Sequence, residues 1–195
     1  MLKERLGNHK IILASGSPRR QHFFKELDID FTIDVREVDE HYPPELKGPE
    51  ITDYLARLKA SMFTDLSEND IVVTSDTIVW MDNAAINKPK DFNEAKKMLS
   101  RLSGSVHEVI TSVCFTGTNF QKTVNDTTKV WFRELTEEEI EYYLNTYQPY
   151  DKAGSYGVQE WIGYVGIDRL EGSYFNVMGL PTRLVYKTLM ELGKP

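Results

Sequence analysis

Hydrophobic and polar positions along the chain predict a succession of strands and helices. Short apolar runs at 11–14 and 71–80 indicate buried strands, and the second run is apolar on both faces, as in a central strand. Residues 18–27 predict a helix that has Ser17 as its N-cap and a proline in its first turn. Residues 49–66 predict a second helix because they carry an apolar stripe with helical spacing. That stripe consists of Ile51, Leu55, Leu58, Met62 and Leu66.

The rest of the chain mixes hairpin signals with helix caps. Asp82-Asn83 is a turn signal between two strands, and capping boxes begin helices at Asp91 and Thr136. Strands are expected at 106–115 and 124–132, two more within 161–178 broken at Glu171-Gly172, and a last helix from Pro181. Because hairpins interrupt the alternation of strands and helices, we predict an α/β fold, a mixed sheet with helices on its faces.

Composition and charge narrow the class of protein. The 195 residues are 41% hydrophobic and 27% charged, which is ordinary for one globular domain over 1–195. The net charge of −7 disfavours non-specific nucleic-acid binding. The single cysteine, Cys114, lies in an apolar run and is expected to be a buried, inert thiol. With no signal-peptide core and no apolar run near the ~18 residues of a membrane span, we expect a cytoplasmic protein with no membrane partner.

The segment from Ser15 to Arg20 joins a predicted strand to a helix. Such a turn presents backbone N–H groups and the positive end of the helix dipole, and Gly16 allows close approach of a ligand. The hydroxyls of Ser15 and Ser17 and the guanidinium groups of Arg19 and Arg20 add donors that suit a phosphate. A phosphate cradle and an ordinary helix cap with two solvated arginines are equally compatible with this segment.

A carboxylate stands within the apolar strand at 71–80. Burying Asp76 is costly unless a metal ion, a hydrogen-bond network or a cleft satisfies it. A position of this kind suits either a general base or a metal ligand, and the sequence leaves both open. The acidic stretch that contains Glu37, Asp39 and Glu40 would add oxygen ligands of the kind that Mg²⁺ prefers, although a solvated acidic loop explains it as well.

Three lysines and one loop complete the candidates. Lys59 lies beside the apolar stripe of its helix, Lys88 ends a strand before a proline, and Lys152 lies in a loop. For each, the alternative is a solvated surface amine. The loop 153–159 is rich in glycine and includes Gln159, whose amide both donates and accepts hydrogen bonds, as recognition of a base or ribose requires; the alternative is a simple turn.

Five segments of the chain are informative together. They are Leu13 to Arg20, Ser75 to Val79, Lys88-Pro89, Asp151 to Gln159 and Gly172 to Pro181. In this order they resemble the Maf family of nucleoside triphosphate pyrophosphatases, which is linked to septum formation. The resemblance implies a single α/β domain, a strongly twisted mixed sheet and two lobes around a cleft, related to the inosine triphosphate pyrophosphatase fold. It also implies attack of water on the α-phosphorus, a divalent cation (Mg²⁺ or Mn²⁺) and a homodimer.

The resemblance also implies roles for individual residues. Asp76 matches the proton acceptor, and Glu37 matches a further polar cleft position that we expect to share the metal with Asp76. Ser15, Arg20, Lys59 and Lys88 match phosphate-side positions, and we expect Lys59 and Lys88 to take part in catalysis. Arg19, Thr77 and Gln159 match positions linked to substrate choice.

Substrate preference follows from the same comparison of residues. Arg at 19, where the 7-methyl-GTP subgroup has Trp, resembles the branch that hydrolyses dTTP and UTP. The chain departs from many relatives at Ser75, at Asn87 and at Glu160-Trp161, and the last change adds a charge and a large ring beside Gln159. The competing hypotheses are 7-methyl-GTP specificity and a nucleotide-binding regulator of cell division without turnover.

Overall fold

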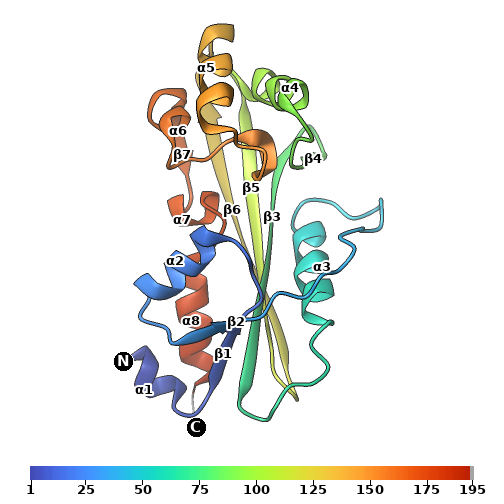
Figure 1. Cartoon of the computed structure of the whole chain (residues 1–195), viewed down its shortest axis with the longest axis vertical. Coiled ribbons are helices and arrows are strands. Elements are labelled where there is room, and N and C mark those ends of the chain that lie inside the picture. Colours follow the sequence, from blue (N-terminus) through green and yellow to red (C-terminus); the bar gives the residue numbers. More distant parts are fainter. Residues whose placement is uncertain (194–195) are drawn as a thin grey trace. The chain divides into compact units, whose positions relative to one another are not determined.

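The structure is a computed structural model that describes residues 1–193 (Figure 1). Its helices are α1 (Leu2–Leu6), α2 (Pro18–Glu26), α3 (Pro49–Ala60), α4 (Phe92–Leu102), α5 (Glu137–Tyr147), α6 (Trp161–Gly166), α7 (Tyr174–Val177) and α8 (Thr182–Leu192), with a short 3₁₀ turn, η1 (Ala153–Ser155). Its strands are β1 (Lys10–Leu13), β2 (Phe31–Ile33), β3 (Asp70–Met81), β4 (Ala84–Ile86), β5 (Val106–Thr116), β6 (Gln121–Phe132) and β7 (Ile167–Glu171).

The strands form one mixed sheet in the order β2-β1-β3-β5-β6-β7, with β4 paired to β3. β1 runs parallel to both β2 and β3, and Leu13 is in register with Val73. β4 pairs antiparallel with β3, and β7 pairs antiparallel with β6. The predicted α/β class with a mixed sheet is therefore confirmed.

The chain folds into two compact units, each built from separate segments. The first unit consists of residues 1–76 and 111–126 together with the chain from 179 onward, and the second consists of 77–110 and 127–178. Strands β3, β5 and β6 each contribute residues to both units.

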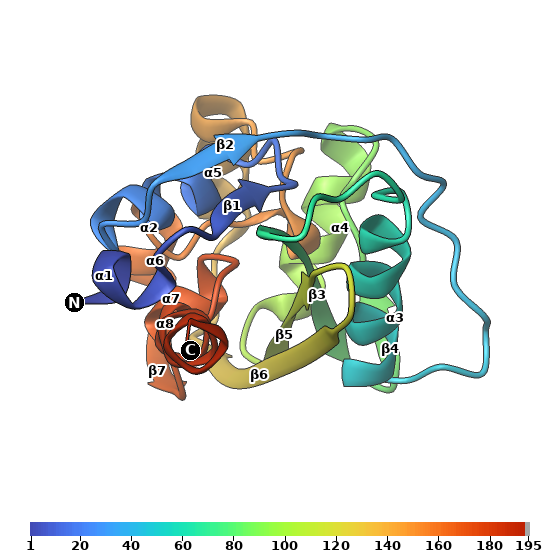
Figure 2. The ribbon, with the colours of Figure 1, turned by 90° about the horizontal axis from the view of Figure 1, so that it is seen from below.

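In the first unit, helices lie on both sides of the sheet. α1 packs against α8, and α3 lies on the other side of β3 from α8 (Figures 1 and 2). Cys114 of β5 is fully buried with Ala56 and Ala60 of α3, as predicted for a structural thiol. Ala56 and Ala60 are small enough to let this helix approach the sheet closely.

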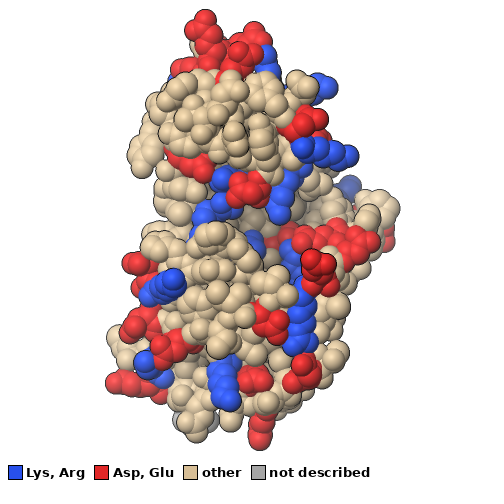
Figure 3. Space-filling model, viewed as in Figure 1, with Lys and Arg blue, Asp and Glu red and all other residues tan. Residues whose placement is uncertain are grey.

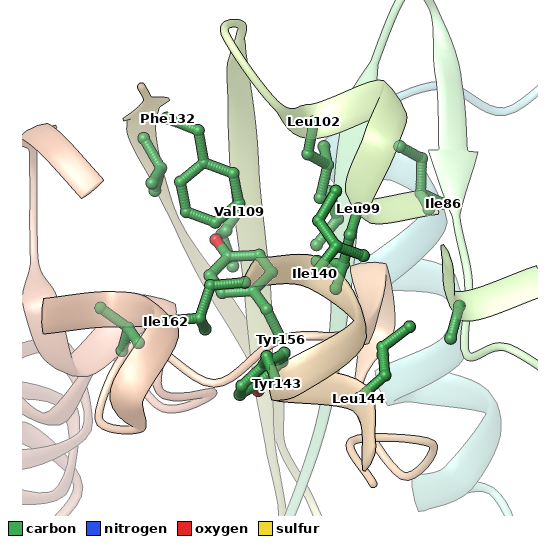
Figure 4. Packing of buried hydrophobic residues seen from close by; sticks show 14 residues of the cluster. Ile86, Leu99, Leu102, Val109, Phe132, Ile140, Tyr143, Leu144, Tyr156 and Ile162 are labelled. Atoms are coloured by element: carbon green, nitrogen blue, oxygen red, sulfur yellow. The ribbon is translucent and has the colours of Figure 1, made fainter. Parts of the chain in front are cut away.

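The second unit has its own core, in which aromatic side chains from several elements meet (Figure 4). α4 packs against α5, and both contribute to the cluster. Tyr143, Tyr156 and Ile162 lie in this cluster together with Phe132 of β6. The core therefore joins α5, the loop around η1 and α6 to the sheet. This packing supports the loop that carries Gln159.

Local signals in the sequence predicted most of the turns and caps correctly. Asp82 and Asn83 both adopt positive φ (52° and 57°) between β3 and β4, as a tight hairpin requires. Asp91 accepts a hydrogen bond from the N–H of Glu94 at the start of α4. Thr136 and Glu139 form the reciprocal capping box of α5.

The helix predicted over 49–66 was too long. α3 ends at Ala60, and the Met62 carbonyl instead accepts a hydrogen bond from Arg36 (2.9 Å). Met62, predicted to lie on the buried stripe, is 39% exposed, whereas Phe63 is buried. A hydrogen bond from an arginine 26 residues away is therefore found where the apolar pattern predicted further helix.

Of the two strands predicted within 161–178, the first is confirmed in part and the second was wrong. Only β7 is a strand there, preceded by α6 and followed by α7. The Gly163 N–H donates to the Glu160 carbonyl, and the Trp161 ring packs edge-on against Tyr142 of α5. This packing against α5 outweighs the β propensity of the apolar residues. α1 and β2 are additional elements that the sequence pattern did not predict.

Surface charges of both signs are interspersed. On the face shown in Figure 3, Lys and Arg side chains lie among Asp and Glu side chains. Among residues 1–193, no helix combines the length and the apolar character that crossing a membrane requires.

Candidate active site

The candidate site in the first unit is built where β3 and α3 pack together. Successive residues on one face of β3 reach successive turns of α3: the Thr74 hydroxyl donates to the Ala56 carbonyl (2.7 Å), and Lys59 Nζ donates to Asp76 Oδ1 (2.7 Å). The two-residue repeat of the strand thus matches a three-residue step on the helix. Asp76 is 7% exposed and the Lys59 side chain 18%, so their ion pair is largely shielded from water.

A second carboxylate reaches the same ammonium group. Glu40 Oε2 lies 3.1 Å from Lys59 Nζ, so one lysine bridges Glu40 and Asp76. Glu37, which the family resemblance implies as a metal ligand beside Asp76, is exposed, and Glu40, whose side chain is half exposed, is the acid of this stretch that pairs with Lys59. Which acid of the stretch reaches Lys59 depends on the path of the 34–48 segment rather than on a local sequence pattern.

Glu40 and Asp76 are the carboxylates of this unit that could hold a divalent cation. Over residues 1–193, no group of three or more His, Cys, Asp or Glu side chains gathers as a metal cluster. Mg²⁺, however, is commonly held by only one or two carboxylates together with substrate phosphates. Glu40 and Asp76 both reach the same Nζ of Lys59, so two carboxylates lie near one point, which is the number that such a substrate-dependent site needs.

The turn after β1 has the features of an anion-binding segment. Ser15 is buried, and its hydroxyl accepts a hydrogen bond from the N–H of Ser17 (3.3 Å). Ser17 occupies the N-cap position of α2 as predicted, but its side chain makes no capping hydrogen bond. A Cβ added to Gly16 would meet no atom within 4 Å, so the backbone there is open to a ligand.

Arg20 fastens this turn to β3. Its guanidinium donates to the Gly179 carbonyl (2.9 Å) and to the Ser75 carbonyl (3.1 Å). Burial lowers the pKa of Arg20, and the negative charge of Asp76 opposes that shift. Arg20 is therefore held beside Asp76, while Arg19 is half-buried one position earlier in α2.

The remaining predicted residues belong to the second unit. Thr77 follows Asp76 directly in β3, and Lys88 is an exposed residue beyond β4. The Gly154 N–H donates to the Asn87 carbonyl (3.2 Å), which places the glycine-rich loop against the residue preceding Lys88. Gly154 has φ +69°, and a Cβ there would lie 2.8 Å from Val79, so this contact requires glycine.

Comparison with known proteins shows the family of the chain. The family model described as "Maf-like protein" matches residues 10–192. The chain belongs to the Maf family. It is 61% identical over 193 residues to the "dTTP/UTP pyrophosphatase" of Christiangramia forsetii, with 98% of each chain covered. It is 56% identical over 191 residues to the protein of the same name from Flavobacterium psychrophilum, covering 97% of this chain and 98% of the other.

Among solved structures, this Maf-family chain resembles a HAM1 protein from Coxiella burnetii. The TM-score is 0.50 at 15% identity, over 94% of this chain and 99% of the other. At this level of identity the similarity concerns the fold alone. This similarity agrees with the α/β class expected from the sequence.

The structure assigns the predicted site residues to the two units. Those whose contacts lie in the first unit are Ser15, Ser17, Arg19, Arg20, Lys59 and Asp76. Those of the second unit are Thr77, Lys88 and Gln159. Lys152, a lysine candidate from sequence, has a side chain only 11% exposed and pairs with Asp151 and Glu160 rather than extending into solvent. Glu40, named from the sequence only as part of an acidic stretch, is the additional residue that the structure brings to Lys59.

Proposed function

We propose that this chain hydrolyses dTTP and UTP to the nucleoside monophosphate and pyrophosphate. The observation that carries the proposal is the shielded pair of Asp76 and Lys59, fastened through Ser75 and Arg20 to an open Gly16 turn. A buried carboxylate beside clustered cations is suited to hydrolysis of a phosphoanhydride, because that reaction needs charge neutralisation and a positioned water. The names of relatives at 56–61% identity supply the substrate class.

The phosphate side of the reaction falls to the turn and its cations. The N–H groups at the start of α2, the hydroxyls of Ser15 and Ser17, and the guanidinium groups of Arg19 and Arg20 bind the phosphate oxygens. Lys88 adds a further positive charge. Because Ser15 and Arg20 are already held by hydrogen bonds, little reorganisation of these two groups is needed as negative charge builds up on the leaving group.

The water side of the reaction falls to Asp76. Its carboxylate orients a water molecule and accepts a proton as the water oxygen bonds to the α-phosphorus. The bond between the α-phosphorus and the bridging oxygen breaks, and pyrophosphate leaves with that electron pair. Lys59 holds the carboxylate in place through its 2.7 Å contact.

A divalent cation, Mg²⁺ or Mn²⁺, completes the proposal. Asp76 and Glu40 would hold it, with Glu37 as the sequence-predicted alternative, and it would neutralise charge on the phosphate oxygens. Base choice falls to Arg19, Thr77 and Gln159. A cytoplasmic location suits this substrate class.

The test is a panel of triphosphates assayed for pyrophosphate and orthophosphate separately. The panel contains UTP, dTTP, CTP, GTP and 7-methyl-GTP, each with Mg²⁺ or Mn²⁺. UTP and dTTP are expected to give pyrophosphate, and in ¹⁸O-labelled water the label is expected in the monophosphate. Release of orthophosphate, label in pyrophosphate or preference for 7-methyl-GTP would contradict the proposal, and binding without turnover would favour a regulator.

A further inference from the structure

One buried tyrosine hydroxyl organises the loop that carries Gln159. Tyr143 of α5 is fully buried, and its hydroxyl accepts a hydrogen bond from the Gly157 N–H (3.0 Å). The same hydroxyl donates to the carboxylate of Glu160. Burial, and next the hydrogen bond to Glu160, raises the pKa of Tyr143 far above its ordinary value, so the hydroxyl keeps its proton and remains a donor.

The other oxygen of Glu160 closes the loop on itself. Glu160 Oε1 lies 3.1 Å from Nζ of Lys152, and their side chains are 18% and 11% exposed. The residues at the two ends of the 152–160 loop are therefore joined by a shielded ion pair. Separating the two side chains would leave two poorly solvated charges. Opening the loop is therefore costly.

Two glycines, Gly157 and Gly163, allow the chain around this loop to pack more closely than any other residue would. A Cβ on Gly157 would lie 2.8 Å from the Glu160 carboxyl carbon, and a Cβ on Gly163 would lie 1.9 Å from the Val158 carbonyl oxygen. Val158 is itself buried in the core of the second unit. Gln159 therefore lies between a buried neighbour and a hydrogen-bonded, ion-paired neighbour, and its backbone position is fixed from both sides.

We propose that Tyr143, Glu160 and Lys152 are positioning residues that set base selectivity by fixing the backbone of Gln159. The proposal rests on the proposed function and goes beyond it, because it assigns a role to three residues outside the phosphate turn and the catalytic acid. A carboxamide distinguishes bases by its donor and acceptor directions, which requires that its backbone be held within a fraction of an ångström. The charge of Glu160 and the ring of Trp161, which distinguish this chain from many relatives, thus help to hold the loop in place.

The decisive variant is Tyr143→Phe, which removes only the hydroxyl. We expect the ratio of kcat/KM for UTP to that for CTP to fall about tenfold, which corresponds to about 1.4 kcal/mol, mainly through a higher KM for UTP. The matched control is Tyr142→Phe, because Tyr142 is the neighbouring residue of α5 but is 51% exposed, and its contact with Trp161 is made by the ring that Phe keeps. That variant is expected to keep the wild-type ratio.

Conservative and disruptive changes at Glu160 separate positioning from folding. Glu160→Gln keeps an acceptor for Tyr143 and is expected to retain more of the selectivity than Glu160→Ala. NMR exchange of the Gly157 amide reports the hydrogen bond directly and is expected to be faster in Tyr143→Phe. If Tyr143→Phe does not fold, Glu160→Gln and Lys152→Met are assayed in the same way, and wild-type selectivity in both overturns the proposal.

The outcomes distinguish this proposal from the proposed function. A wild-type protein that releases no pyrophosphate from any triphosphate overturns the proposed function, and selectivity is then measured as the ratio of Kd values for UTP and CTP. A wild-type ratio in Tyr143→Phe, by turnover or by binding, overturns the positioning role while leaving the proposed function intact. An equal loss in Tyr142→Phe and Tyr143→Phe overturns it too.

Discussion

The guanidinium of Arg20 donates a hydrogen bond to the carbonyl oxygen of Ser75, the residue immediately before Asp76 in β3. A helix that begins at Pro18 is thereby fastened to the strand that carries the buried carboxylate. This hydrogen bond holds the cationic turn beside the strand that carries the acid, although more than fifty residues separate them in the sequence. We therefore expect some substitutions in the turn to lower stability and others to lower turnover, depending on whether the side chain holds β3 or binds substrate.

Replacing Asp76 tests the acid directly. Asp76→Asn is expected to lower kcat for UTP by about a hundredfold or more, because the amide cannot accept the proton of the attacking water. The thermal midpoint should change little, because Lys59 retains its ion pair with Glu40. The control is Asp82→Asn at the exposed β3–β4 turn, which should turn over normally. Near-wild-type turnover of Asp76→Asn would remove Asp76 from the mechanism.

The adjacent arginines are expected to behave differently. Arg20→Ala leaves two backbone carbonyls without their donor and should cost about 2 kcal/mol of unfolding free energy as well as activity. Arg19→Ala should lower kcat/KM for pyrimidine triphosphates far more than it lowers stability. Chemical denaturation and steady-state kinetics on both variants measure this difference. Parallel losses of stability and activity in Arg19→Ala would contradict a substrate role.

Two glycines make a matched pair for separating binding from folding. Gly16→Ala meets no atom within 4 Å and should keep the wild-type thermal midpoint, yet raise KM for UTP because the methyl group lines the phosphate turn. Gly163→Ala would place its Cβ 1.9 Å from the Val158 carbonyl oxygen and should strongly destabilise the protein. Thermal melts with UTP kinetics check both, and an unchanged KM in Gly16→Ala would argue against the turn as a binding site.

His107 makes stability depend on pH. It is buried, hydrogen-bonded to the Tyr156 hydroxyl (2.7 Å), and burial lowers its pKa from 6.5 to about 4. Between these values the unfolded chain binds the proton and the folded chain does not, so stability is complete above pH 6.5 and falls as the pH decreases toward 4. The loss amounts to roughly 3 kcal/mol over that window.

Unfolding by urea between pH 8 and 4 measures this dependence. His107→Gln should flatten the curve in that window, whereas His22→Gln, at an exposed position, should leave it unchanged. An unaltered pH dependence in His107→Gln would show that other groups are responsible.

The sequence predicted those parts of the fold that neighbouring residues determine. The hairpin turn at Asp82-Asn83 and the cap at Thr136 follow from backbone preferences and short-range hydrogen bonds. It failed where distant contacts decide, as where Arg36 takes the Met62 carbonyl and where Trp161 packs on Tyr142. A single sequence does not specify such partners.

The same distinction applies to the candidate site. Asp76 stands out locally because a carboxylate interrupts an apolar strand, and the turn from Ser15 onward stands out because strand, glycine and helix start coincide. The choice of Glu40 over Glu37, and the Tyr143 hydroxyl beneath the glycine-rich loop, depend on tertiary packing alone. Buried hydroxyls of this kind look like ordinary core aromatics in a sequence.

The chain passes between its two units at four places, 76/77, 110/111, 126/127 and 178/179, and three of these fall inside continuous strands. Neither half can therefore be obtained by cleaving one linker, because each unit consists of segments that are separate in the chain. Proteolytic nicking or truncation should abolish all structure together rather than release a stable remnant. In evolution, this arrangement forbids exchanging one half as a module, so new specificities must arise by replacing side chains in place.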